Sequence, residues 1–174
     1  LFLSASCARD PRSEADRAFE ELTARFLDRY LEFHPEEATA LGDHRFDSLL
    51  TNFSVDAITA RSRLYRAYRD TVRGIRVETL SPRHMIDYDI LRHAIETELY
   101  AIEELREWEW NPLQYDVGAV LHQLIARGSA SDENRMRSLT GRLRRIPQSL
   151  ENARRNLNAP PVLHLSLIHI SEPT

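Results

Sequence analysis

The sequence predicts an all-α protein, a bundle of long amphipathic helices, on three observations. Apolar residues recur at intervals of three and four along most of the 174-residue chain. Serine and proline stand where helices would begin, and proline or glycine stands where they would end. No stretch shows the polar–apolar alternation of a half-buried strand.

A first helix is predicted over residues 13–33, with Ser13 as its N-cap. Pro35 begins a second, short helix that ends at Gly42, and residues 43–53 form a loop. The buried face of the first helix should contain the aromatic and leucine positions Phe19, Leu22, Phe26, Tyr30 and Phe33.

Ser54 is the predicted cap of a third helix. Ser81 followed by Pro82 begins a long fourth helix that runs to Asn111, because Pro112 cannot continue it. The expected buried positions are Ile58, Tyr65, Tyr68, Val72 and Ile75 in the third helix, and Tyr88, Leu91, Ile95, Leu99, Ile102 and Leu105 in the fourth.

A further helix is expected over residues 113–127, closing at Gly128. Ser131 caps a last helical region, which Pro147 kinks or splits. Its predicted buried face contains Met136, Leu139, Leu143, Ile146, Leu150, Ala153 and Leu157.

The composition excludes several classes of protein. The chain has 23 basic and 27 acidic residues and a net charge of −4, so nucleic acid is not an expected partner. One cysteine excludes an internal disulfide and a cysteine-only metal cluster. Every basic residue is arginine, which indicates the codon bias of a GC-rich bacterial genome.

Charge is segregated along the chain. Six arginines lie in 61–76, eight acids in 87–109, and seven arginines in 135–155. We expect the acidic helix to pair with both basic segments, each exposed pair contributing about 0–1 kcal/mol. A nucleic-acid surface along the arginine helices is the alternative.

Two histidine pairs are candidates for metal binding. His34 with Glu37, and His93 with Glu96, have the i, i+3 spacing that places both side chains on one helix face. Di-iron bundles use the opposite order, glutamate before histidine. Surface neighbours are therefore the favoured interpretation, and the chain is expected to hold no metal.

Two other groups of residues were considered for chemistry. Asp87 and Asp89 are two apart, so they do not share a helix face and are interpreted as first-turn acids. Trp108, Trp110 and Tyr115 could line a ligand cleft, although packing of a helix corner is favoured.

The first 13 residues resemble the end of a bacterial lipoprotein signal. An apolar start leads into small residues and Cys7, the candidate lipid attachment site, with Ser4 where a leucine is preferred. Residues 1–13 would then be a signal remnant and tether. This predicts an exported, periplasmic or membrane-anchored lipoprotein. A frayed tail with an incidental cysteine, in a cytoplasmic protein, is the alternative.

The last ten residues, 165–174, resemble a translated sequencing adapter, L-S-L-I-H-I-S-E-P-T. Such a scar is excluded from fold reasoning. We therefore expect the native sequence to continue beyond residue 164.

Several motifs occur together in the order seen in one bacterial family, domain of unknown function 885. The chain resembles this family over roughly residues 17–164. The matching segments are F-L-D-R-Y-L-E-F-H-P-E-E-A-T-A-L-G at 26–42, L-S-P at 80–82, I-D-Y-D-I-L at 86–91, E-L-R-E-W-E-W-N-P-L at 104–113, R-R-I-P at 144–147, A-R-R-N-L at 153–157 and P-P at 160–161.

This resemblance implies that residues 14–164 are the helical N-terminal portion of a larger metallopeptidase-like fold. Members resemble exported zinc carboxypeptidases, whose H-E-x-x-P-G-H-like motif would hold zinc and activate water. That motif is absent here, so no catalytic, cofactor-binding or metal residue is assigned, and the fragment should be inactive alone. The implied partners are the missing C-terminal part and a peptide substrate. A self-contained helical interaction or structural protein is the alternative.

Overall fold

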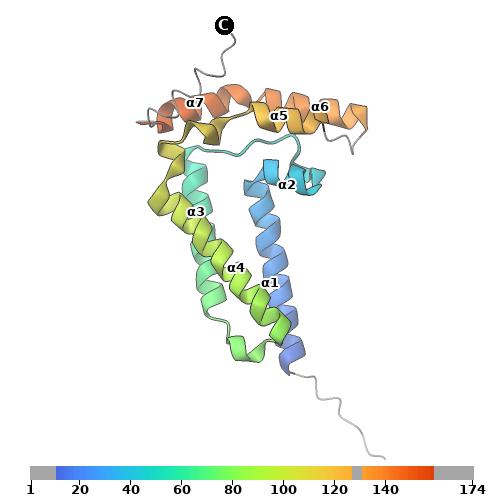
Figure 1. Cartoon of the computed structure of the whole chain (residues 1–174), viewed down its shortest axis with the longest axis vertical. Coiled ribbons are helices and arrows are strands. Elements are labelled where there is room, and N and C mark those ends of the chain that lie inside the picture. Colours follow the sequence, from blue (N-terminus) through green and yellow to red (C-terminus); the bar gives the residue numbers. More distant parts are fainter. Residues whose placement is uncertain (1–10, 127–130, 159–174) are drawn as a thin grey trace, which may run out of the picture.

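A computed structural model describes residues 11–126 and 131–158. Within these ranges the protein is all-α, as predicted. Three helices lie together in one bundle: α1 (Pro11–Phe33), α3 (Val55–Arg73) and α4 (Pro82–Tyr100). A second layer crosses one end of this bundle (Figure 1), and it contains α5 (Gly118–Ala126), α6 (Asp132–Leu143) and α7 (Ile146–Asn156). The short helix α2 (Pro35–Leu41) links the two parts.

The main core lies between the three bundled helices. Its buried residues are Phe19, Leu22, Phe26, Ile58, Tyr65, Val72, Leu80, Tyr88, Leu91, Ile95, Leu99 and Ile102. Each large apolar side chain buried in this way contributes about 1.5–3 kcal/mol. The predicted apolar faces of these helices are confirmed at most positions, whereas Leu105 is largely exposed.

Helix starts follow the predicted caps at two serines. The Ser54 hydroxyl accepts the Ala57 amide at 3.3 Å, and the Ser131 hydroxyl accepts the Asn134 amide at 3.4 Å. Each serine thereby satisfies an amide that has no partner within the first turn of its helix.

The predicted cap at Ser13 is wrong, because helix α1 begins at Pro11 and Ser13 lies inside it. Ser81 is the N-cap residue of α4, as predicted, and Pro82 is the first residue of the helix. The Ser81 hydroxyl lies 2.8 Å from Nδ1 of His84 and caps no amide, because the imidazole is a competing partner.

The fourth helix ends earlier than predicted. A π-helical turn at Ala101–Leu105 follows α4, and Arg106 then adopts a left-handed conformation with φ of 49°. The indole N–H groups of Trp108 and Trp110 donate to the carbonyls of Ile102 and Leu105. These bonds satisfy carbonyls at the helix end, so the chain turns before it reaches Pro112.

The helix predicted over 113–127 is also shorter. Pro112–Tyr115 forms a single 3-10 turn, and α5 begins at Gly118. The Asp116 carboxylate accepts the Gly118 amide at 2.8 Å, which fixes the start of the helix.

The split at Pro147 is confirmed. The predicted buried face of the last region is confirmed at Ala153, with Leu157 packed beside it, and is wrong at three other positions. Met136, Leu143 and Leu150 are 60%, 46% and 52% exposed, whereas Arg142 is completely buried. A Cβ atom added to Gly141 would lie 2.7 Å from Cβ of Ser48. Helix α6 therefore packs its glycine–arginine side, and not its apolar side, against the loop before α3.

The predicted pairing of the acidic segment 87–109 is confirmed with only one of the two basic segments, 61–76. Arg66 pairs with Glu103 at 2.7 Å, and Arg73 pairs with Glu96 at 3.3 Å. Within the described ranges, no ion pair joins 135–155 to the acidic segment 87–109. The paired arginines of that segment find acids on their own helices.

Cys7 and the tail 165–174 lie outside the described residues, as do Gly128 and the prolines at 160–161. Among the described helices, none has both the length and the apolar content needed to cross a membrane.

Candidate functional site

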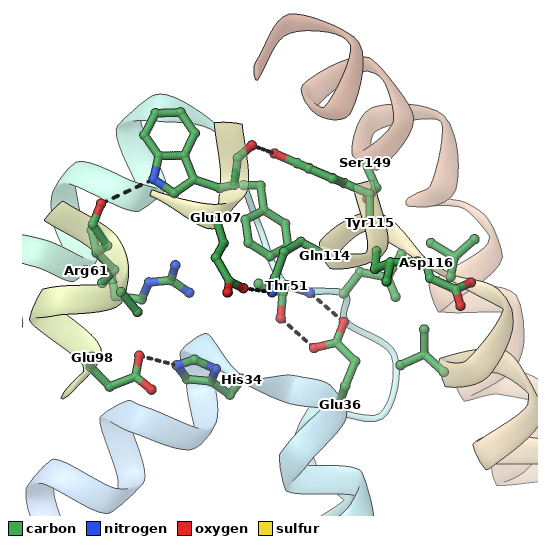
Figure 2. A pocket seen from close by; sticks show the side chains of 18 residues that line it. His34, Glu36, Thr51, Arg61, Glu98, Glu107, Gln114, Tyr115, Asp116 and Ser149 are labelled. Atoms are coloured by element: carbon green, nitrogen blue, oxygen red, sulfur yellow. Dashed lines mark hydrogen bonds and ion pairs between the residues drawn. The ribbon is translucent and has the colours of Figure 1, made fainter. Parts of the chain in front are cut away.

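A cavity of about 450 Å³ lies where the bundle meets the crossing layer. Figure 2 shows its charged and aromatic side chains converging from α2, α3, α4 and the turns that follow α4. The residues used below are His34, Glu36, Arg61, Glu98, Glu107 and Tyr115. This volume is within the usual range of small-molecule pockets.

Arg61 is the most unusual residue of the cavity. It lies on α3, in the register of the core positions Ile58 and Tyr65, and is only 7% exposed. Its Nε–H is buried without an acceptor, and its guanidinium has no ion pair with another described residue. The guanidinium carbon lies 6.0 Å from the Phe53 ring centroid, at the limit of a cation–π contact.

A histidine–carboxylate pair lines the same cavity as Arg61. Nε2 of His34 lies 3.5 Å from Oε2 of Glu98 and 3.2 Å from the Tyr65 hydroxyl. The Tyr30 ring stacks on His34 with centroids 4.3 Å apart. Burial, with the negative charge of Glu98 nearby, raises the pKa of both Tyr30 and Tyr65 above the ordinary value. These tyrosines therefore stay neutral hydrogen-bonding groups at physiological pH.

Two further carboxylates face the cavity and are already hydrogen-bonded. Glu36 accepts from both the amide, at 2.8 Å, and the hydroxyl of Thr51. Glu107 accepts from the side-chain amide of Gln114 at 2.6 Å. Together with Glu98 they make the cavity wall predominantly acidic around one buried cation.

Some of the aromatic residues that were predicted to pack at a helix corner also line the cavity. Trp108 and Tyr115 border the cavity, whereas Trp110 does not. The Tyr115 hydroxyl donates to the Trp108 carbonyl at 2.6 Å and accepts from Asn156 at 2.9 Å. The predicted corner packing is therefore confirmed for Tyr115, and two of the three aromatic residues line the cavity, while the ligand-cleft alternative stays a prediction.

Replacing Tyr115 by phenylalanine is expected to lower the free energy of unfolding by about 1–2 kcal/mol, because two buried partners lose a hydrogen bond. Urea denaturation followed by circular dichroism would measure this change. Tyr100→Phe is the control, since Tyr100 is 58% exposed. Equal losses in the two variants would contradict the role given to the Tyr115 hydroxyl.

The predicted metal candidates do not come together. His34 contacts Glu98, while Glu37 accepts from the Tyr30 hydroxyl at 2.7 Å. His93 is exposed on α4. No group of three or more histidine, cysteine, aspartate or glutamate side chains in the described part of the chain is placed to hold a metal ion, so these residues do not fit a zinc site.

Asp87 and Asp89 are not first-turn acids, because α4 begins at Pro82. Asp89 instead lies 3.6 Å from Arg92, an exposed pair of small energetic value.

Sequence reasoning missed Arg61 and Glu98 as members of one site. One signal was present: Arg61 occupies a helical position between Ile58 and Tyr65, three and four residues away, on the face that should be apolar. No comparable signal marked Glu98, which belongs to a run interpreted as a charged face.

Three comparisons with known proteins bear on this site. A family model described as "Bacterial protein of unknown function (DUF885)" matches residues 35–166. The fold is similar to a solved structure titled "The structure of a putative lipoprotein of unknown function from Shewanella oneidensis". The TM-score is 0.80 at 23% identity, over 86% of this chain and 27% of that chain. The chain thus spans about a quarter of that protein, and the likeness shows the fold alone. No curated protein matches the sequence.

Proposed function

Because the chain belongs to the bacterial DUF885 family, we propose that residues 14–164 are the N-terminal helical part of an exported zinc-dependent peptidase of the carboxypeptidase type. In this proposal the zinc and the residues that activate water belong to the remaining part of the longer protein. The helices described here form one wall of the substrate cleft.

The cavity at the junction of the two layers carries this proposal. It combines aromatic side chains with charged groups that converge from three helices, and such convergent polar groups fix the orientation of a bound ligand. The similar lipoprotein is several times longer than the matched region, which supports a larger parent protein. Its description as a lipoprotein also supports an exported location.

The exposed apolar side chains of α6 and α7 give further support. Met136, Leu143 and Leu150 follow a helical face that would ordinarily be buried. We propose that the remaining part of the longer protein covers this face.

The longer reading frame at the same locus tests the proposal. We expect the longer protein to bind zinc stoichiometrically and to release C-terminal residues from peptides, with activity lost on chelation. The 174-residue chain should do neither. A frame that soon stops, or that lacks paired histidines with a glutamate, would contradict the peptidase and favour a helical interaction protein. Tight zinc binding by the 174-residue chain would overturn the assignment of the metal to the remaining part.

A further inference from the structure

We propose that the guanidinium of Arg61 binds the terminal carboxylate of a peptide in the cavity, while Glu98 and Glu107 face the N–H groups of that peptide. The role of Arg61 as the anchor for an anionic ligand is inferred from the geometry of the cavity. The identity of its ligand as a peptide rests on the proposed function.

Arg61 is a buried cation that has no ion pair with another described residue. Arginine remains protonated in proteins, so Arg61 carries a full positive charge at 7% exposure. A buried cation without an acceptor is unfavourable unless something else compensates it. Its Nε–H is buried without an acceptor, while Figure 2 shows the guanidinium extending into the open cavity. An anionic ligand in that cavity would accept from the terminal N–H groups of the guanidinium and compensate its charge.

The core fixes the position of Arg61 on α3. Arg61 shares a helix face with Ile58 and Tyr65, and both of these lie in the main core. Its guanidinium carbon lies 6.0 Å from the centroid of the Phe53 ring, on the loop before α3. A guanidinium presents a planar pair of donors, which matches the two oxygens of a carboxylate.

The charge around Arg61 favours a peptide over phosphate. Glu36, Glu98 and Glu107 would repel a doubly charged phosphate. A peptide brings one carboxylate for Arg61 and several amide or ammonium N–H donors for the glutamates. Glu98 is the best placed acceptor, because among the described residues its close partner is His34 at 3.5 Å, whereas Glu36 and Glu107 already accept hydrogen bonds.

Calorimetric titration of the 174-residue chain with trialanine and with trialanine amide tests this inference. We expect the free acid to bind at least about tenfold more tightly than the amide, as loss of a charge-assisted hydrogen bond predicts. Arg61→Gln should remove that difference. Arg63→Gln is the matched control, since Arg63 is exposed on the same helix and does not line the cavity.

Equal affinity for acid and amide, or no binding of trialanine, would overturn the assignment. The acid–amide comparison uses the unaltered chain, so it decides the question even if Arg61→Gln does not fold. Binding of inorganic phosphate without trialanine would assign the site to phosphate and also overturn it. The 174-residue chain could bind trialanine while the longer protein shows no zinc-dependent hydrolysis. That result would support this binding site and overturn only the proposed function.

Discussion

Replacing Arg142 by methionine is expected to lower the free energy of unfolding by about 3–5 kcal/mol, the cost of removing one member of a buried charged network. Methionine replaces the aliphatic stem of arginine and has no hydrogen-bond donor. The loss would therefore report the guanidinium, through its polar contacts and the buried space that it fills.

These contacts join four segments that are far apart in the sequence. The guanidinium donates to the carbonyls of Leu49 at 2.9 Å and Val120 at 3.1 Å, and to the Thr39 hydroxyl at 2.6 Å. It also reaches the Pro35 carbonyl at 3.3 Å. Arg142 thereby ties α2, α5 and α6 to the loop before α3.

A buried carboxylate completes this network. The Thr39 hydroxyl donates to Asp47 at 2.8 Å, so it links the guanidinium to a negative charge. Burial lowers the pKa of Arg142, and the nearby charges of Glu36 and Asp47 oppose that shift. Removing the guanidinium would leave several buried carbonyls without their hydrogen-bond donor and the Asp47 carboxylate without the nearby positive charge of Arg142.

Urea denaturation followed by circular dichroism would measure the effect of Arg142→Met. Arg144→Met is the matched control, because Arg144 is exposed two residues further along. Its expected change is within about 0.5 kcal/mol. Similar stability of both variants would show that Arg142 does not hold the crossing layer in place.

The second large effect is expected from Ile95→Ala, which should lower the free energy of unfolding by about 2–5 kcal/mol. Ile95 is completely buried where α4 packs on α1 and α3. Removing three of its carbon atoms loses their transfer free energy and leaves a cavity that rigid helices fill only in part.

Ile90 on the same helix is the control, because it is 62% exposed. Ile90→Ala should change the free energy of unfolding by less than about 0.5 kcal/mol in the 174-residue chain. A large loss at Ile90 in the same urea titrations would mean that this face is covered in solution. Equal effects at both positions would contradict the described orientation of α4.

Much of the fold is predictable from local sequence. Ser54, Pro82 and Ser131 place the starts of three helices correctly, and the periodic apolar residues of α1, α3 and α4 form the main core. These signals act within one or two helical turns, so neighbouring residues in the chain are sufficient to detect them.

The candidate site was only partly predictable. Trp108 and Tyr115 cluster around a predicted helix break, which marks them as possible cleft residues, and both line the cavity. The spacing of His34 in the sequence points to Glu37, yet its close carboxylate partner is Glu98. That partner is on another helix, and local spacing carries no information about such pairs.

The sequence by itself thus determined an all-α chain, the starts of several helices and the residues of the main core. Only the tertiary structure decided which charged residues are buried. Arg142 is buried by contacts to residues about 20 to 107 positions away, while the apolar positions beside it face outward. Burial depends on which segments lie across from a side chain, and that is a property of the packed fold and not of one helix.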